Sequence, residues 1–224
     1  MIISARESLK SWVKARAWAK PVLREINHSR CEAWDLIHGV DTCGKIPLSG
    51  LDFDSKNKTA GLEYQSHHPA LTRSALMELP VQYDDYSFID IGCGKGRVLL
   101  IASEFPFRRI IGVEFAPTLA EIARNNLQSY RRAHTVCTEI EVVTGDALEY
   151  NLAPEAQVLY FFSPFSPSVL DQIVQRIEDS FQRSPRDLLV MFSGVIPMRE
   201  RAFGWRPQYE RLSRKPHMDV YRHR

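Results

Sequence analysis

The chain has 224 residues, of which 44% are hydrophobic and 25% are charged, and its formal net charge is +2 at pH 7. These values are typical of a soluble globular protein that can bury a sizeable core. No apolar stretch is long enough to cross a membrane, and the N-terminal residues lack the apolar core of a secretory signal. We therefore expect a cytoplasmic protein with no membrane partner.

The four cysteines stand far apart in the sequence, with no Cys-x-x-Cys pair and no histidine at metal-ligand spacing. This pattern indicates neither a zinc site nor a disulfide framework. We expect reduced thiols and no bound metal. The cysteines are Cys31, Cys43, Cys93 and Cys137.

The charges are unevenly distributed. Residues 1–30 hold seven basic and two acidic side chains, and residues 199–224 hold eight basic and three acidic ones. The middle of the chain, residues 31–198, therefore has 14 basic and 22 acidic side chains, a balance of −8. Basic ends could contact nucleic acid, or they could pair with the acidic body. We favour pairing, because neither end interleaves basic and aromatic residues densely.

The first third of the chain is predicted to be an extension. Residues 4–26 carry apolar side chains at helical spacing, with Pro21 at a kink or at a second helix start. Residues 27–66 are rich in turn residues, and loops of this length are often functional, so we expect a lid over the acceptor side of the site. A short helix over residues 70–79 ends before Pro80.

From residue 87 onward, apolar runs alternate with helical patterns. Such continuous apolar runs are typical of buried parallel strands, and the alternation predicts an α/β fold built from βαβ units. Two short runs at the C-terminus, 208–215 and 218–224, predict an antiparallel hairpin at one edge of the sheet. The expected strands lie in 87–91, 109–115, 140–145, 156–162 and 187–193, and the expected helices in 96–104, 117–130 and 167–182.

A glycine-rich turn follows the first of these strands and reads Asp90-x-Gly92-x-Gly94-x-Gly96. Glycines allow a sharp turn and a close approach of the backbone to a ligand. A dinucleotide-binding turn would need another glycine where Arg97 stands, and the Asp90 carboxylate would repel a pyrophosphate. An NAD-dependent oxidoreductase is therefore disfavoured. The same carboxylate suits a ligand with an amino group or a positive charge.

This turn resembles the first motif of class I S-adenosylmethionine-dependent methyltransferases. The resemblance covers residues 62 to 224 and implies a Rossmann-like fold with S-adenosyl-L-methionine as cofactor. In that family an acid at the end of the second strand binds the ribose hydroxyls, a position held here by Glu114. An acid or amide after the third strand contacts the adenine, a position held here by Asp146. Alternatively, Glu114 is a solvated strand-end acid, and Asp146 caps a helix or a turn.

The resemblance divides the chain into an N-terminal helix and lid-like extension, 1–66, and a methyltransferase domain, 67–224. The segment before the first strand commonly closes over the methionine end of the cofactor, so Tyr64, His67 and His68 could contact the cofactor or relay a proton. Lys95 and Arg97 are expected to begin the first helix and to face solvent or the acidic body. The residues assigned to the cofactor are Tyr64, Asp90, Gly92, Cys93, Gly94, Gly96, Glu114, Phe115, Asp146 and Ala147.

The predicted catalytic residues, Ser163, Pro164 and Phe165, follow the fourth strand. They resemble the Asp/Asn/Ser-Pro-Pro-aromatic loop of amino-methylating family members, in which oxygens accept hydrogen bonds from the target NH₂ and the ring stacks on a planar acceptor. Here one proline is missing, which argues against base methylation. The aromatic strand before the loop, 160–162, also resembles that of Dot1-type protein lysine methyltransferases, with Phe161 as a core residue.

Four stretches together look like those of a bacterial group of methyltransferases: HGVDTCGKIPL, DIGCGKGRVLL, GVEF and YFFSPF. These resemblances imply methylation of an amine or amide nitrogen of a protein or small molecule. RNA is a weaker alternative. Duplex DNA is not expected, because no separate domain is available to stabilise an extruded base. A catalytically idle binding module stays open as another alternative.

Overall fold

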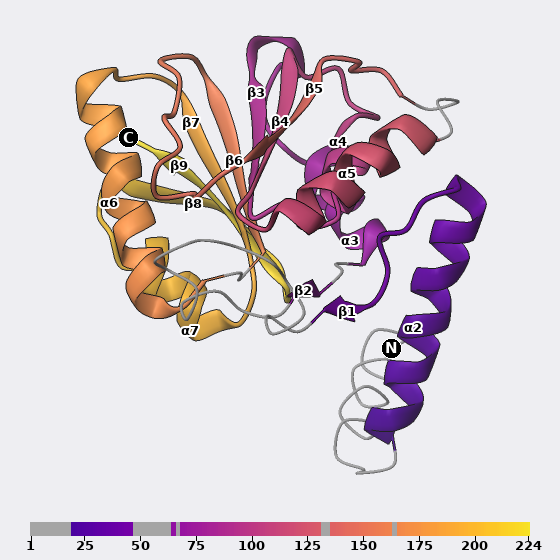
Figure 1. The fold of residues 1–224 in the computed structure, drawn as a ribbon. Coiled ribbons are helices and arrows are strands. Elements are labelled where there is room, and N and C mark those ends of the chain that lie inside the picture. Colours follow the sequence, from indigo (N-terminus) through magenta and orange to yellow (C-terminus); the bar gives the residue numbers. More distant parts are fainter. Residues whose placement is uncertain (1–18, 47–63, 66–67, 131–134, 163–164) are drawn as a thin grey trace.

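The computed structural model describes residues 19–46, 64–65, 68–130, 135–162 and 165–224. Its centre is a seven-stranded sheet with the strand order β5-β4-β3-β6-β7-β9-β8 (Figure 1). The first five of these strands in chain order are parallel, and the last two form an antiparallel hairpin. The strands are β3 (Ser87–Ile91), β4 (Arg109–Glu114), β5 (Ile140–Thr144), β6 (Gln157–Phe162), β7 (Leu188–Ser193), β8 (Tyr209–Arg214) and β9 (Met218–His223).

The order of the strands reverses beside β3. The chain runs outward from β3 through β4 to β5 and then returns to place β6 on the other side of β3. In the register of these pairs, Asp90 of β3 lies between Gly112 of β4 and Tyr160 of β6. Open α/β sheets bind ligands at the carboxyl ends of the strands at such a reversal. In Figure 1 this edge of the sheet faces down.

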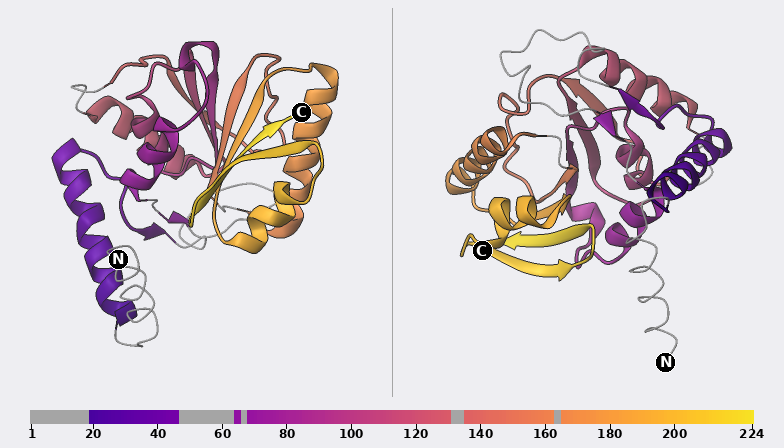
Figure 2. Two further views of the ribbon diagram at one scale, coloured as in Figure 1. Left: turned by 180° about the vertical axis from the view of Figure 1, so that it is seen from behind. Right: turned by 90° about the horizontal axis from the view of Figure 1, so that it is seen from below.

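Helices cover both faces of the sheet (Figures 1 and 2). Alternate side chains along β3 divide between two cores: Phe88 packs on one face, and Ile89 and Ile91 pack on the other. The first face carries α3 (Pro69–Met77), α4 (Arg97–Ala102) and α5 (Pro117–Ser129). The second carries α6 (Pro167–Arg183), α7 (Ile196–Arg199) and a π-helical turn over Glu200–Gly204. The predicted Rossmann-like fold with its C-terminal hairpin is confirmed.

The N-terminal region differs from expectation. Helix α2 (Ala19–His38) continues through residues 27–38, where we expected a loop. Pro21 lies in its first turn, where a missing N–H removes no helical hydrogen bond, so it does not break the helix. The start of the predicted helix, residues 4–18, and residues 47–63 of the predicted lid 27–66 lie outside the described residues. Beyond α2, β1 (Lys45–Ile46) pairs antiparallel with β2 (Tyr64–Gln65) at the carboxyl side of the sheet (Figure 1).

Cys31 and Cys43 form a disulfide, with their Cα atoms 5.6 Å apart. The expectation of reduced thiols is therefore wrong for this pair. The two residues meet because α2 ends at His38 and Gly39, with φ 69°, reverses the chain. Cys93 and Cys137 are free and buried. Among the described helices, none is long and apolar enough to cross a membrane.

Candidate cofactor and acceptor site

The glycine turn lies at the carboxyl end of β3. Gly92, Gly94 and Gly96 have φ values of 83°, 54° and 84°, in the left-handed region that side chains with a Cβ atom avoid. A Cβ on Gly96 would also lie 3.1 Å from the Cβ of Ala123, so glycine lets α4 and α5 approach each other closely. The turn therefore presents bare backbone at the sheet edge, as a ligand-binding turn requires.

Asp90 is buried next to this turn, with 2% of its surface exposed. No hydrogen bond among the described residues ends on its carboxylate. Burial, and then the neighbouring Glu114, raise the pKa of Asp90 well above its usual value. A buried carboxylate without donors is costly, and a ligand that brings an ammonium group would lower that cost.

Glu114 ends β4 and is also buried, but its carboxylate is held by the backbone. Oε2 accepts a hydrogen bond from Gly94 N at 2.8 Å, and Oε1 accepts one from Ala116 N at 3.0 Å. Burial raises the pKa of Glu114 to about 6, while hydrogen bonds from the backbone of Ala116, Gly94 and Phe115 oppose the rise. Glu114 therefore connects the glycine turn to the end of the next strand. It is not a solvated strand-end acid.

Asp146 follows β5, and its Oδ1 accepts a hydrogen bond from Leu148 N at 2.8 Å. Its side chain thus shapes a turn, as in one of the two predicted readings, and it lies half-buried at the same edge of the sheet. Phe115 and Ala147 are half-buried beside these acids. Cys93 is buried in the glycine turn, and burial raises the pKa of its thiol well above the usual value, which keeps it protonated.

Lys95 and Arg97 were expected to face solvent or the acidic body of the chain; they are buried, and they face carboxylates of that body. Lys95 Nζ donates to Asp41 Oδ1 at 2.7 Å, and Arg97 Nη2 donates to Asp35 Oδ1 at 2.9 Å. The partners come from α2 and the turn after it, more than 50 residues earlier in the chain. Sequence reasoning missed this contact, although Asp35 and Asp41 stand in the quoted stretch or next to it.

The candidates before the first strand are described in part. Tyr64 lies on β2, but its side chain, like all of His67, is outside the described residues. His68 precedes α3, and its buried Nδ1 has no hydrogen-bond partner among the described residues. Burial, followed by the charges of Arg30 and Arg97, lowers the pKa of His68, so its ring is neutral at physiological pH.

The predicted acceptor loop begins where β6 ends. Ser163 and Pro164 lie outside the described residues, and Phe165 is buried, with 8% of its surface exposed, against the core under α6. Phe161 is fully buried and lies 5.9 Å from Phe192 between ring centroids, which confirms it as a core residue. Next to this loop, the carboxyl end of β7 exposes Val195 and Ile196.

Comparisons with known proteins agree with this geometry. Residues 88–182 match the family model described as "Methyltransferase domain". The matched residues and the strand order of the sheet are consistent with a class I methyltransferase. Its sequence matches no curated protein.

Several solved structures are similar to this chain. One is a predicted N6-adenine-specific DNA methylase from Listeria monocytogenes, with 13% identity and a TM-score of 0.52 over 71% of this chain and 51% of that one. The chain thus spans about half the length of the Listeria protein. Another is an RNA methyltransferase from Salinibacter ruber in complex with S-adenosylhomocysteine, with 21% identity and a TM-score of 0.47 over 70% of this chain and 91% of that one.

The residues of the methyltransferase domain fit S-adenosylmethionine, the cofactor of this class. Among the described residues, none donates a hydrogen bond to the Asp90 carboxyl, which suits an amino group, and the three left-handed glycines place no side chain in the turn beside it. Glu114, already ordered by two backbone donors, has the chemistry to accept ribose hydroxyls. At neutral pH the Glu114 carboxylate favours a cationic sulfonium ligand, and a bound cation would also favour ionisation of Asp90.

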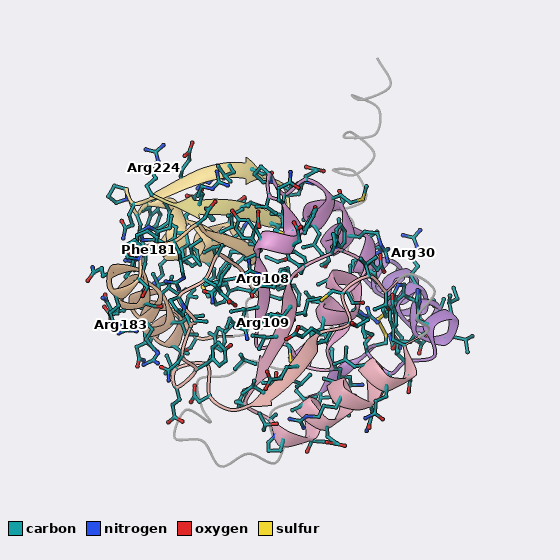
Figure 3. All side chains as sticks on the ribbon, turned by 90° about the horizontal axis from the view of Figure 1, so that it is seen from above. Arg30, Arg108, Arg109, Phe181, Arg183 and Arg224 are labelled. Atoms are coloured by element: carbon teal, nitrogen blue, oxygen red, sulfur yellow. A yellow bond between two sulfur atoms is a disulfide. The ribbon has the colours of Figure 1, made fainter. Side chains whose placement is uncertain are left out.

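The basic C-terminus of the domain is neutralised by its own surroundings. Arg199 pairs with Asp219 in the core, and Lys215 pairs with Glu78. Arg201, Arg211, Arg214, Arg222 and Arg224 each have a carboxylate partner as well. Figure 3, which views the opposite, amino edge of the sheet, shows Arg108, Arg109, Arg183 and Arg224 around that edge. For this end of the chain, the expected pairing of basic and acidic groups is confirmed.

Proposed function

We propose that this chain transfers the methyl group of S-adenosylmethionine to a nitrogen atom, an amine or amide, of a protein or small molecule. The cofactor part of this proposal is carried by one observation: the buried Asp90 carboxyl beside the glycine turn accepts no hydrogen bond from the described residues. A bound cofactor would supply an ammonium group there and an activated methyl on a sulfonium centre. We assign the ribose hydroxyls to Glu114 and the adenine to Asp146, with Ala147 and Phe115 beside them.

The chemistry asks the chain mainly to position two groups. The acceptor nitrogen must hold its lone pair in line with the carbon–sulfur bond that breaks, and water must be excluded, since positioning provides much of the rate. The acceptor then releases one proton. His68 is a candidate to receive it through solvent or a bound water, because its lowered pKa leaves the ring neutral.

The acceptor half of the proposal rests on Ser163-Pro164-Phe165 after β6. A hydroxyl oxygen and a backbone carbonyl in this loop can accept hydrogen bonds from an NH group, and these would orient its lone pair toward the donor. Phe165, which is buried beside this loop, would then form an apolar wall behind the acceptor. If the methyl group went instead to an oxygen that carries no hydrogen, the two hydrogen-bond acceptors of this loop would have no N–H partner.

Nucleic acid is the weaker candidate acceptor. The paired C-terminal arginines leave little uncompensated positive charge there for phosphate contacts, and the base-methylating loop lacks its second proline. We therefore rank RNA second, and we do not propose duplex DNA.

Mass spectrometry of an extract incubated with the protein and methyl-labelled cofactor tests the whole proposal. We expect label on nitrogen in a protein or small molecule. Label on duplex DNA, or on an oxygen or carbon, would overturn the acceptor assignment. Cofactor binding without any labelled product across a broad acceptor panel would indicate an idle binding module.

A further inference from the structure

Two positively charged side chains lie within or directly after the glycine motif. Lys95 stands between Gly94 and Gly96, and Arg97 follows directly, and both side chains are more than nine-tenths buried. Buried cations need well-placed acceptors, because the surrounding protein replaces water poorly. Their carboxylate partners Asp41 and Asp35 lie outside residues 88–182, the part of the chain that matches the family model.

Asp35 organises the segment that makes these contacts. Its Oδ2 accepts hydrogen bonds from Thr42 N at 2.6 Å and from Cys43 N at 2.5 Å, and its Oδ1 accepts the Thr42 hydroxyl at 2.6 Å. Thr42 Oγ1 in turn accepts a hydrogen bond from Arg97 Nε at 2.6 Å. The Arg97 guanidinium also lies 5.0 Å from the centre of the Trp34 ring. The turn after α2 and the start of α4 thus share one buried network.

Asn126 of α5 extends this network to the backbone of the glycine turn. Its Nδ2 donates to Lys95 O at 2.9 Å and to Asp41 O at 2.8 Å, and its Oδ1 accepts from Asp41 N at 2.8 Å. Lys95 Nζ meanwhile donates to Cys43 O at 3.1 Å. Both the side chain and the carbonyl of Lys95, the residue between Gly94 and Gly96, are therefore fixed by residues 41–43 and Asn126.

We propose that Asp35, Asp41 and Asn126 are positioning residues of the cofactor site, and that docking of residues 34–43 on Lys95 and Arg97 sets the cofactor affinity of the glycine turn. The three left-handed glycines leave the turn free to adopt other conformations, and the docked segment selects one of them. The inference rests on the proposed function, because it assumes that this turn binds S-adenosylmethionine.

Asp41→Asn is the sharpest test, because the Asp41 side chain is 68% exposed and its charge matters to the fold mainly through Lys95. Calorimetry with S-adenosylhomocysteine should show affinity reduced about tenfold, within the range by which residues away from a ligand alter coupling. Asp41→Glu should restore much of the affinity. The double variant Asp41→Asn/Lys95→Met should lose less than the sum of its single variants, since both act on one contact.

Asp171→Asn is the control, because Asp171 of α6 is also a partly exposed acid in an ion pair, here with Arg201. It should leave the affinity unchanged. Equal losses in the control and in Asp41→Asn, or an Asp41→Asn variant with wild-type affinity and wild-type circular dichroism, would overturn the inference. Failure of the wild-type protein to bind S-adenosylhomocysteine would instead overturn the proposed function.

Discussion

The carboxyl ends of β3 and β4 and those of β6 and β7 share one edge of the sheet but differ in construction. On the proposed donor side, Asp90 and Glu114 are almost completely buried, and the Glu114 carboxylate is fixed by two backbone donors. On the proposed acceptor side, Val195 and Ile196 are exposed, and Phe165 belongs to the core. Of these residues, the acids on the donor side are held within the chain, whereas those on the acceptor side are apolar.

This difference corresponds to what each side has to recognise. One cofactor with fixed chemistry can be met by a pre-organised set of charges, which lowers the entropy that binding would otherwise cost. An apolar edge with few fixed polar groups discriminates weakly by itself. The described residues therefore define the proposed cofactor side in more detail than the proposed acceptor side.

The largest effect is expected for Glu114→Gln, which removes the charge from the donor side. Two ribose hydroxyls that donate to a carboxylate make charge-assisted bonds, so binding of S-adenosylhomocysteine should weaken by about 2–3 kcal/mol, or roughly 30- to 150-fold. Calorimetry measures this, with Glu141→Gln, an exposed acid on β5, as the control. Unchanged affinity in a folded variant would show that Glu114 only holds the turn.

Phe165→Leu should affect the acceptor side alone. The substitution keeps an apolar side chain in the core but removes the ring, and loss of an aromatic contact should lower turnover about tenfold. Affinity for S-adenosylhomocysteine should stay within about twofold. Steady-state rates with the identified acceptor check the first expectation. A parallel loss of cofactor affinity would contradict the division between the two sides.

Acid should weaken the donor side through Glu114. The folded apoprotein holds the pKa of this carboxyl near 6, above its ordinary value, so the group gains a proton as the pH falls through 6. Since the carboxylate is the form that accepts both hydroxyls, affinity for S-adenosylhomocysteine should fall about tenfold from pH 7.5 to pH 5. Calorimetry at both values tests this. Glu114→Gln should show a smaller change, and an equal change in both proteins would assign the titration elsewhere.

The smallest effect is expected for the exposed pair on the acceptor side. Val195→Ser/Ile196→Ser should leave cofactor affinity and melting temperature near wild-type values, because both side chains face solvent. The KM of the acceptor should rise by less than about fivefold, as for a peripheral contact. A much larger rise would identify this edge as the main docking point for the acceptor.

Strands and helices of the domain could be predicted because their signals are local. Buried parallel strands such as β3 and β7 are continuous apolar runs, and turn residues separate them from helices with a 3.6-residue period. The acids at the ends of β3 and β4 could be predicted for the same reason, since each follows directly from where its strand ends. The π-helical turn at Glu200–Gly204 had no such local signal.

Contacts between distant segments could not be predicted. Trp34, Asp35 and His38 lie on α2, but residues 27–66 as a whole are rich in turn residues, which indicated a loop. What makes residues 27–38 helical is packing: Trp34 and His38 stack with Tyr130, and Asp35 meets Arg97. Residues 27–38 alone do not indicate that their partners are Arg97 of α4 and Tyr130, which follows α5.

The disulfide between Cys31 and Cys43 closes a covalent ring with a sequence separation of 12. Asp35, Asp41 and Thr42 all lie within this ring. Cross-linking a loop of about 15 residues removes roughly 3 kcal/mol of chain entropy from the unfolded state in the simplest model. If residues 31–43 detach from the rest of the chain, the disulfide still holds the two ends of this segment together. Reduction of the disulfide would give the same residues many more conformations in the detached state.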